Sequence, residues 1–160
     1  DWCREASISI NGSSQESKSV SSAYTALKRT WQNGDTIRLS LPMPIEQIEA
    51  HPNITNNQGK VALRRGPMLY CLEEIDHDDH VHGMILPEDL GLEAETAPDL
   101  LGGITVIRGN ALAPDRESWN DELYRPSSHT ALRVTDLTAI PYYAWNNRGK
   151  GNMTTWIHEG

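Results

Sequence analysis

The densest group of side chains that could bind a metal ion lies between residues 76 and 82. The segment carries carboxylates and imidazoles in close succession: Asp76, His77, Asp78, Asp79, His80 and His82. Both kinds of side chain are ordinary zinc ligands, and in an extended segment His80 and His82 would point to the same side. Loops of this composition are more often solvated connectors. We therefore expect no ordered metal here and keep His77, His80 and His82 as weak metal candidates.

Carboxylates that could act in pairs on a glycosidic bond occur in two places. Glu73 and Glu74 follow an apolar run, and a polar loop near residues 116–126 holds or adjoins four more: Asp115, Glu117, Asp121 and Glu122. Retaining hydrolysis needs two carboxyl groups about 5 Å apart across the sugar. Closeness in sequence does not establish such a pair, and acidic residues are common on an acidic surface. We expect no catalytic residue among them.

The two cysteines invite a nucleophilic interpretation that their surroundings oppose. Cys71 lies between Tyr70 and Leu72, a setting typical of a buried strand, whereas a reactive thiolate needs an electropositive and partly exposed site. Cys3 follows Trp2 and has no recognisable partner. The pair forms neither a disulfide framework nor a CxxC motif, which fits a reducing compartment and a cytoplasmic location, with a single bridge as the alternative.

Aromatic and arginine side chains in the second half of the chain are candidates for carbohydrate or inter-domain contact. The six candidates are Trp119, Tyr124, Tyr142, Tyr143, Trp145 and Arg148. Exposed rings can support a sugar, but we favour packing between sheets or against another domain. Arginine adds charge-assisted hydrogen bonds to such contacts. The Arg65-Gly66-Pro67 segment indicates a structural turn rather than a substrate clamp.

Charge and hydropathy exclude two classes of partner. The 160 residues include 14 basic and 22 acidic side chains, a net charge of −8. That charge opposes binding to nucleic acid phosphates and to anionic membranes. No apolar run approaches the roughly 20 residues that a membrane-spanning helix needs. We expect neither nucleic acid nor membrane as a partner.

Short alternating or apolar runs separated by turn residues predict the elements that position these side chains. Residues 6–10 alternate before Asn11-Gly12, and residues 24–31 and 36–41 are expected to form a hairpin through the turn at 32–35. Residues 76–103 are left irregular, and 116–126 are expected to be a loop. Further strands are expected at residues 45–50, 60–64, 68–73, 104–108, 131–139 and 153–157.

This pattern predicts an all-β fold of one or two antiparallel, jelly-roll-like β-sandwich modules. Pro42 and Pro44 interrupt the pattern, because proline lacks the backbone donor that a central strand requires. The predicted modules are residues 1–55 and 56–160, with the boundary between 44 and 59. Four side chains in or beside the strands are expected to be largely buried, either in the core or against a partner surface: Tyr70, Leu72, Trp145 and Trp156.

Several segments, in one order along nearly the whole chain, carry a family resemblance. Two are long and specific, residues 61–73 (Val-Ala-Leu-Arg-Arg-Gly-Pro-Met-Leu-Tyr-Cys-Leu-Glu) and residues 139–149 (Ala-Ile-Pro-Tyr-Tyr-Ala-Trp-Asn-Asn-Arg-Gly). Shorter ones are Trp-Gln-Asn-Gly-Asp at 31–35, Leu-Pro-Met-Pro at 41–44 and Ala-His-Pro at 50–52. Together they resemble the C-terminal region of bacterial glycoside hydrolase family 127, the β-L-arabinofuranosidases.

The resemblance implies an upstream α/α barrel that carries the active site, followed by β-sandwich domains. Such enzymes remove terminal β-L-arabinofuranose with retention, using a zinc-bound cysteine thiolate and a glutamate acid/base; the zinc has one glutamate and three cysteine ligands. A chain with two cysteines cannot supply that set. We therefore expect a non-catalytic accessory or scaffolding region partnered by the barrel, with a second copy as a further candidate partner. A carbohydrate-binding module is the alternative, and an independent enzyme is a third reading. The first residue, Asp1, also suggests a fragment.

Overall fold

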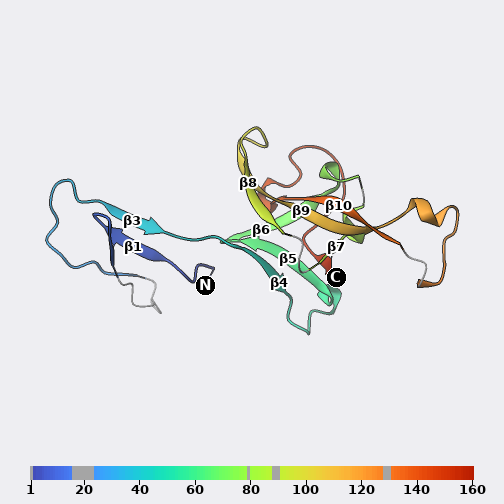
Figure 1. The fold of residues 1–160 in the computed structure, drawn as a ribbon, viewed down its shortest axis with the longest axis horizontal. Coiled ribbons are helices and arrows are strands. Elements are labelled where there is room, and N and C mark those ends of the chain that lie inside the picture. The colour runs from blue at the N-terminus through green and yellow to red at the C-terminus, as the bar shows by residue number, and fades with distance from the viewer. Residues whose placement is uncertain (1, 16–23, 79, 88–90, 128–130) are drawn as a thin grey trace. The chain divides into compact units, whose positions relative to one another are not determined.

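A computed structural model describes residues 2–15, 24–78, 80–87, 91–127 and 131–160, and it divides the chain into two compact units, Asp1–Pro44 and Ile45–Gly160 (Figure 1). The expected all-β class is confirmed. Strands form both units, and the helical elements in these described ranges are single 3-10 turns of three residues.

The first unit is a small antiparallel sheet in the order β2-β1-β3, formed by β1 (Ser7–Ile10), β2 (Ser13–Gln15) and β3 (Ile37–Ser40). Ile10 pairs with Ser13, so Asn11 and Gly12 form the two-residue turn. Both have positive φ, 51° and 79°, as a type I′ turn requires, and the expected turn is confirmed.

The predicted hairpin between residues 24–31 and 36–41 is wrong in its first strand. Residues 24–31 form no strand, and β3 pairs with β1 instead. The cause lies in the turns. Asn11 Nδ2 donates to Asp35 Oδ1 over 2.7 Å, and the Thr36 backbone N–H donates to Asn11 Oδ1 over 2.9 Å. These bonds join the turn after β1 to the turn before β3, so the two strands lie side by side.

The described residues of the second unit form nine strands, and β6 pairs with three of them. The nine strands are β4 (Ile45–Glu49), β5 (Lys60–Arg65), β6 (Met68–Glu73), β7 (Ile85–Leu86), β8 (Glu93–Ala97), β9 (Ile104–Pro114), β10 (Leu132–Pro141), β11 (Met153–Thr154) and β12 (Ile157–Glu159). The 3-10 turns are η1 (Thr55–Asn57), η2 (Glu74–Asp76), η3 (Val81–Gly83), η4 (Glu117–Trp119) and η6 (Tyr142–Ala144).

The strands expected at residues 45–50, 60–64 and 68–73 are confirmed, and those expected at 104–108 and 131–139 are parts of longer strands. Arg65 pairs with Met68, so Gly66 and Pro67 form the predicted structural turn, with Gly66 at φ 59°. Residues 76–103 are not wholly irregular, because they contain β7 and β8. Glutamate and alanine are poor strand formers, and β8 is held by its pairing with β9.

Strand pairing in the second unit closes into a ring of six strands, β6-β10-β9-β7-β12-β5, in which β5 returns to β6. Among the described strands of this unit, β7 and β12 pair in parallel and the other pairs are antiparallel. β4, β8 and β11 extend the sheet outside this ring. The arrangement resembles a small barrel, which leaves no open edge along the ring. The expected sandwich arrangement is therefore not confirmed, although the all-β class is.

The core fills both sides of β6. Tyr70 and Leu72 belong to the larger apolar cluster, whereas Cys71, on the opposite face, packs in a second cluster with Val106 and Ile140. Tyr70 and Leu72 are thus buried as expected. The larger cluster also contains Val61, Leu63, Val81, Met84, Leu86, Ile107, Leu137 and Ile157.

Two tryptophans are not fully buried within the second unit. Trp156 is half-buried and Trp145 is 40% exposed, so Trp145 does not lie in the core, and its burial against a partner surface stays a prediction. Trp145 lies after η6, beyond the end of β10.

The described ranges contain no helix of the length and apolar character that a membrane crossing would require.

Replacing Leu137 by Ala should lower the free energy of unfolding by about 2 to 5 kcal/mol, because Leu137 is 1% exposed in the larger cluster and the change leaves a cavity. Leu132 lies on the same strand and is 47% exposed, so Leu132→Ala should change the stability by less than about 0.5 kcal/mol. Denaturant unfolding of both variants measures the difference. Equal losses would contradict this description of β10.

Candidate functional site

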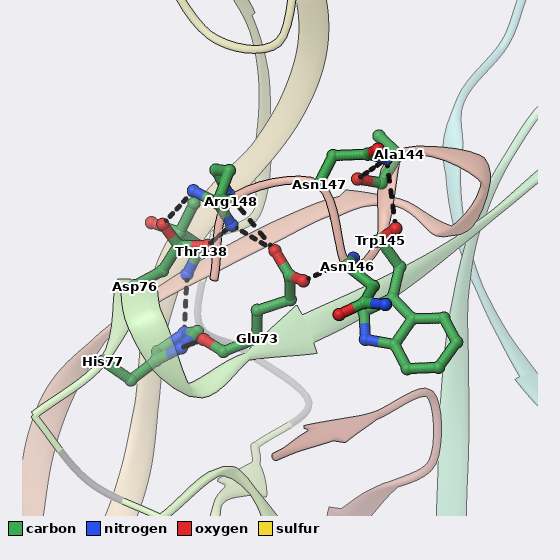
Figure 2. A network of polar contacts seen from close by, with 9 residues as sticks. All are labelled: Glu73, Asp76, His77, Thr138, Ala144, Trp145, Asn146, Asn147 and Arg148. Atoms are coloured by element: carbon green, nitrogen blue, oxygen red, sulfur yellow. Dashed lines mark hydrogen bonds and ion pairs between the residues drawn. The ribbon is translucent and has the colours of Figure 1, made fainter. Parts of the chain in front are cut away.

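A cluster of charged side chains lies at the end of β6, and its centre is Arg148 (Figure 2). The Arg148 guanidinium donates to Asp76 Oδ1 through Nη1 over 2.6 Å and to Asp76 Oδ2 through Nη2. Its Nε and Nη2 also donate to Glu73 Oε2. The side chains of Arg148, Glu73 and Asp76 are 15%, 7% and 16% exposed. The arginine thus bridges two largely buried carboxylates.

The segment that carries Arg148 is shaped by two asparagines. Asn146 has a φ of 63°, a left-handed conformation that asparagine tolerates better than most residues, and its backbone N–H donates to Glu73 Oε1 over 2.9 Å. Asn147 Nδ2 donates to the carbonyl oxygens of Ala144 and Trp145. These bonds turn the chain after η6 so that Arg148 meets Glu73 (Figure 2).

His77 extends the network with both ring nitrogens. The Thr138 backbone N–H donates to His77 Nε2 over 3.2 Å, so Nε2 must carry a lone pair. Nδ1 lies 2.7 Å from the Glu73 carbonyl oxygen, and it must therefore carry the proton and donate. The ring is held as the neutral Nδ1-H tautomer between β6 and β10. In this arrangement neither nitrogen is available to a metal ion.

The arrangement is suited to holding strands together rather than to proton transfer. All four carboxylate oxygens of Glu73 and Asp76 accept a hydrogen bond. The hydrogen bonds that Arg148 donates to Asp76, and then those that it donates to Glu73, raise its pKa, while its partial burial lowers it. An acid/base pair would need a carboxyl oxygen facing substrate. Here each oxygen faces the protein.

The other members of the 76–82 segment are dispersed. His80 Nδ1 lies 2.5 Å from Glu74 Oε1, and His82 is exposed. Hydrogen bonds from the Asn152 backbone and then from His80 lower the pKa of Glu74 to about 2. Asp79 lies outside the described residues. Within the described ranges, no three histidine, cysteine or carboxylate side chains lie close enough together to hold a metal ion.

Cys71 is buried, as the interpretation of a structural thiol requires. It is 2% exposed, and burial, followed by the nearby Glu73 charge, raises its pKa to about 12. The thiol therefore stays protonated near neutral pH, which does not suit a nucleophile. Cys3, the other cysteine, belongs to the first unit. The residues present do not fit a zinc site of three cysteines and one glutamate.

Four apolar side chains are exposed where β6 begins and β10 ends: Leu69, Tyr142, Tyr143 and Trp145, hereafter the aromatic surface. The rings of Tyr142 and Trp145 are stacked, with centroids 6.0 Å apart and planes at 25°. Tyr143 is 68% exposed. Exposed rings grouped in this way are typical of a contact surface.

Trp119 and Tyr124 lie on the loop after β9, apart in sequence from the aromatic surface. The Arg125 guanidinium lies over the Trp119 ring, 4.0 Å from its centroid, and Tyr124 is 91% exposed. Among the six candidate contact residues, Arg148 binds Glu73 and Asp76 within the second unit.

Sequence reasoning named Glu73, Asp76, His77 and Arg148 separately but missed their association. Glu73 and Arg148 are 75 positions apart, and no local pattern relates them. The two long family-like runs could have indicated the association, however. Glu73 ends one of the two long specific runs, and Arg148 lies in the other.

Family comparisons match both units. The glycoside hydrolase family 127 C-terminal domain matches residues 45–158, and the β-L-arabinofuranosidase GH127 middle domain matches residues 1–43. A non-reducing end β-L-arabinofuranosidase from Bifidobacterium longum subsp. longum is 32% identical over 126 residues, which cover 75% of this chain and 19% of that protein.

Solved structures of GH127 enzymes are also similar to this chain. A GH127 β-L-arabinofuranosidase from Geobacillus stearothermophilus T6 has a TM-score of 0.88 at 46% identity and is matched over 99% of this chain and 25% of its own. A GH127 β-arabinofuranosidase has a TM-score of 0.83 at 31% identity, with 98% and 23% covered. The chain thus spans between a fifth and a quarter of the length of these relatives.

Replacing Arg148 by Ala should lower the free energy of unfolding by about 3 to 5 kcal/mol, because it leaves two largely buried carboxylates without a partner. Thermal and denaturant unfolding measure the loss.

The matched control is Arg64→Ala, which breaks the more exposed pair between Arg64 and Glu46, whose side chains are 30% and 25% exposed. Its loss should be about 1 kcal/mol or less. If Arg148→Ala cost no more than Arg64→Ala, the cluster would not hold the fold.

Cys71 should resist alkylation by iodoacetamide at pH 8 in the folded chain, because its pKa of about 12 and its burial leave almost no accessible thiolate. Mass spectrometry of the Cys3→Ser variant isolates the Cys71 reaction, and the same variant in denaturant provides the fully reactive reference. Labelling of folded and unfolded Cys71 at similar rates would contradict its placement.

Proposed function

The chain belongs to glycoside hydrolase family 127, and we propose that it is a non-catalytic accessory and scaffolding region within a larger enzyme of the β-L-arabinofuranosidase type. The whole protein would hydrolyse terminal β-L-arabinofuranosides with retention. The catalytic α/α barrel, with its zinc site, would lie upstream of this chain.

The main support for the proposal is that the largely buried charged side chains of the cluster are fully hydrogen-bonded within the protein. Glu73 and Asp76 accept hydrogen bonds at every carboxyl oxygen, and Arg148 supplies most of them. Cys71, the cysteine nearest this cluster in sequence, is protonated and buried. Carboxylates and a cysteine can act in catalysis, but here Glu73 and Asp76 hold strands together and Cys71 packs in the core.

The aromatic surface supports a scaffolding role, with the remainder of the same enzyme as its occupant. Tyr142 and Trp145 are 45% and 40% exposed although they are large and partly apolar, and covering them would remove apolar area from water. Relatives that contain this region are about four times longer, so they include much more chain that could cover it. A second copy of the protein is the other occupant to be tested.

The first unit supports the same role. Ile37 and Leu39 of β3 are more than half exposed, and a three-stranded sheet of this size buries little apolar area by itself. The match of residues 1–43 to a family middle domain suggests that further strands of that domain cover these side chains.

The isolated chain should show no β-L-arabinofuranosidase activity, with or without added zinc. Retaining hydrolysis requires a nucleophile and an acid/base across the sugar, and Glu73, Asp76 and Cys71 all face the protein. The chain should be assayed on an aryl β-L-arabinofuranoside beside the full-length protein, which should turn the substrate over.

Circular dichroism and cooperative thermal unfolding of the isolated chain would establish that inactivity does not come from misfolding. Zinc-dependent turnover by the chain that is abolished by Cys71→Ser would refute the accessory role. Absence of activity in the full-length protein would instead refute the proposed parent reaction.

A further inference from the structure

A pocket of about 470 Å³ lies in the second unit between the end of β9, η3 and the loop that contains η4. Its volume falls in the range of small-molecule sites. The walls combine apolar and polar groups, including His80, Pro114, Arg116, Trp119, Asn120 and Glu122. This pocket shares none of its lining residues with the Arg148 cluster or the aromatic surface.

Trp119 is fixed at the pocket wall by polar contacts rather than by the core. Arg125 covers one side of the indole, with its guanidinium 4.0 Å from the ring centroid. Arg125 donates to the Ser118 carbonyl oxygen over 2.9 Å and to Ser118 Oγ over 3.1 Å, and Ser118 Oγ donates to the Asp115 carbonyl oxygen. The ring is therefore oriented before any ligand arrives, which lowers the entropy lost on binding.

The backbone beside Trp119 is strained. Asn120 has φ 48° and ψ −125°, a combination that residues with a side chain rarely adopt. Hydrogen bonds on both sides keep it there, from the Trp119 N–H to the Arg116 carbonyl oxygen and from the Glu122 N–H to the Trp119 carbonyl oxygen. The strained turn brings Trp119, Asn120 and Glu122 to one pocket.

The charges around the pocket favour a neutral ligand. Arg116 and Glu122 have opposite signs, and His80 is held through Nδ1 by Glu74. Such a balance selects neither an anion nor a cation. It offers donors and acceptors beside an indole and the ring of Pro114, so it suits a molecule with an apolar face and a rim of hydroxyl groups.

We propose that this pocket binds a neutral saccharide, with a sugar ring against the indole of Trp119 and its hydroxyl groups hydrogen-bonded to Asn120, Glu122 and Arg116. The site adds carbohydrate binding to the scaffolding role. The proposed saccharide site stands whether or not the chain contains a catalytic centre.

The test is affinity electrophoresis of the full-length protein through gels that contain soluble arabinan, galactan or xylan, three neutral polysaccharides. Trp119→Ala should weaken retention on at least one of them about tenfold or more, the scale expected when a central aromatic contact is truncated. Trp119→Phe should keep most of the retention. Polygalacturonate, an anionic polymer, should show no retention that depends on Trp119.

Trp31→Ala is the matched control, because Trp31 also lies under an arginine, with Arg29 5.1 Å from its centroid, and does not line this pocket. It should leave retention unchanged. Asn120→Gly is a second variant that removes the amide while glycine accepts the positive φ, so it should weaken retention without loss of thermal stability.

Retention by Trp119→Ala and Asn120→Gly equal to that of the parent protein on all three neutral polysaccharides would overturn the proposal. So would an equal loss in Trp31→Ala, or a Trp119-dependent retention on polygalacturonate alone.

Discussion

The bridge from Arg148 to Glu73 and Asp76 is the interaction on which the second unit depends. β6 and β10 pair through Leu72 and Ala139, and the bridge then fixes the segment that leaves β10 against the end of β6. From that point the chain continues into β11, which pairs with β6, and β12, which pairs with β5 and β7. Because β12 lies between β5 and β7, closure of the strand ring follows from where Arg148 holds the chain.

A buried bridge of this kind specifies an arrangement more than it adds stability. Removing three charged groups from water carries a desolvation cost that their attraction offsets only when every hydrogen-bonding position is filled. Here the Asn146 N–H fills the position on Glu73 that Arg148 leaves, and His77 joins the same strand end to Thr138. The low-polarity surroundings that make this geometry strict also keep the neighbouring Cys71 protonated. One local environment therefore explains both a firm scaffold and an unreactive thiol.

Local signals in the sequence predicted the strands well and the long-range arrangement poorly. Apolar runs such as residues 68–73 and turn pairs such as Asn11-Gly12 act within a few residues, so their interpretation was confirmed. Residues 24–31 look like a strand but form none, because Asn11 and Asp35 direct β3 to β1. β8 is held by β9 against its own propensity. The partners of Arg148 lie more than seventy positions away, and no local pattern could identify them.

The proposed roles are internal scaffolding for the charged cluster and contact with the rest of a larger enzyme for the aromatic surface. Both can be tested by hydrogen exchange measured by mass spectrometry, on the isolated chain and on the same residues within the full-length protein. Amides of residues 142–145 should exchange more slowly in the full-length protein, while those of β5 and β6 should exchange at the same low rate in both. Equal exchange of residues 142–145 in the two proteins, or protection of β6 that appears only in the full-length protein, would contradict the account.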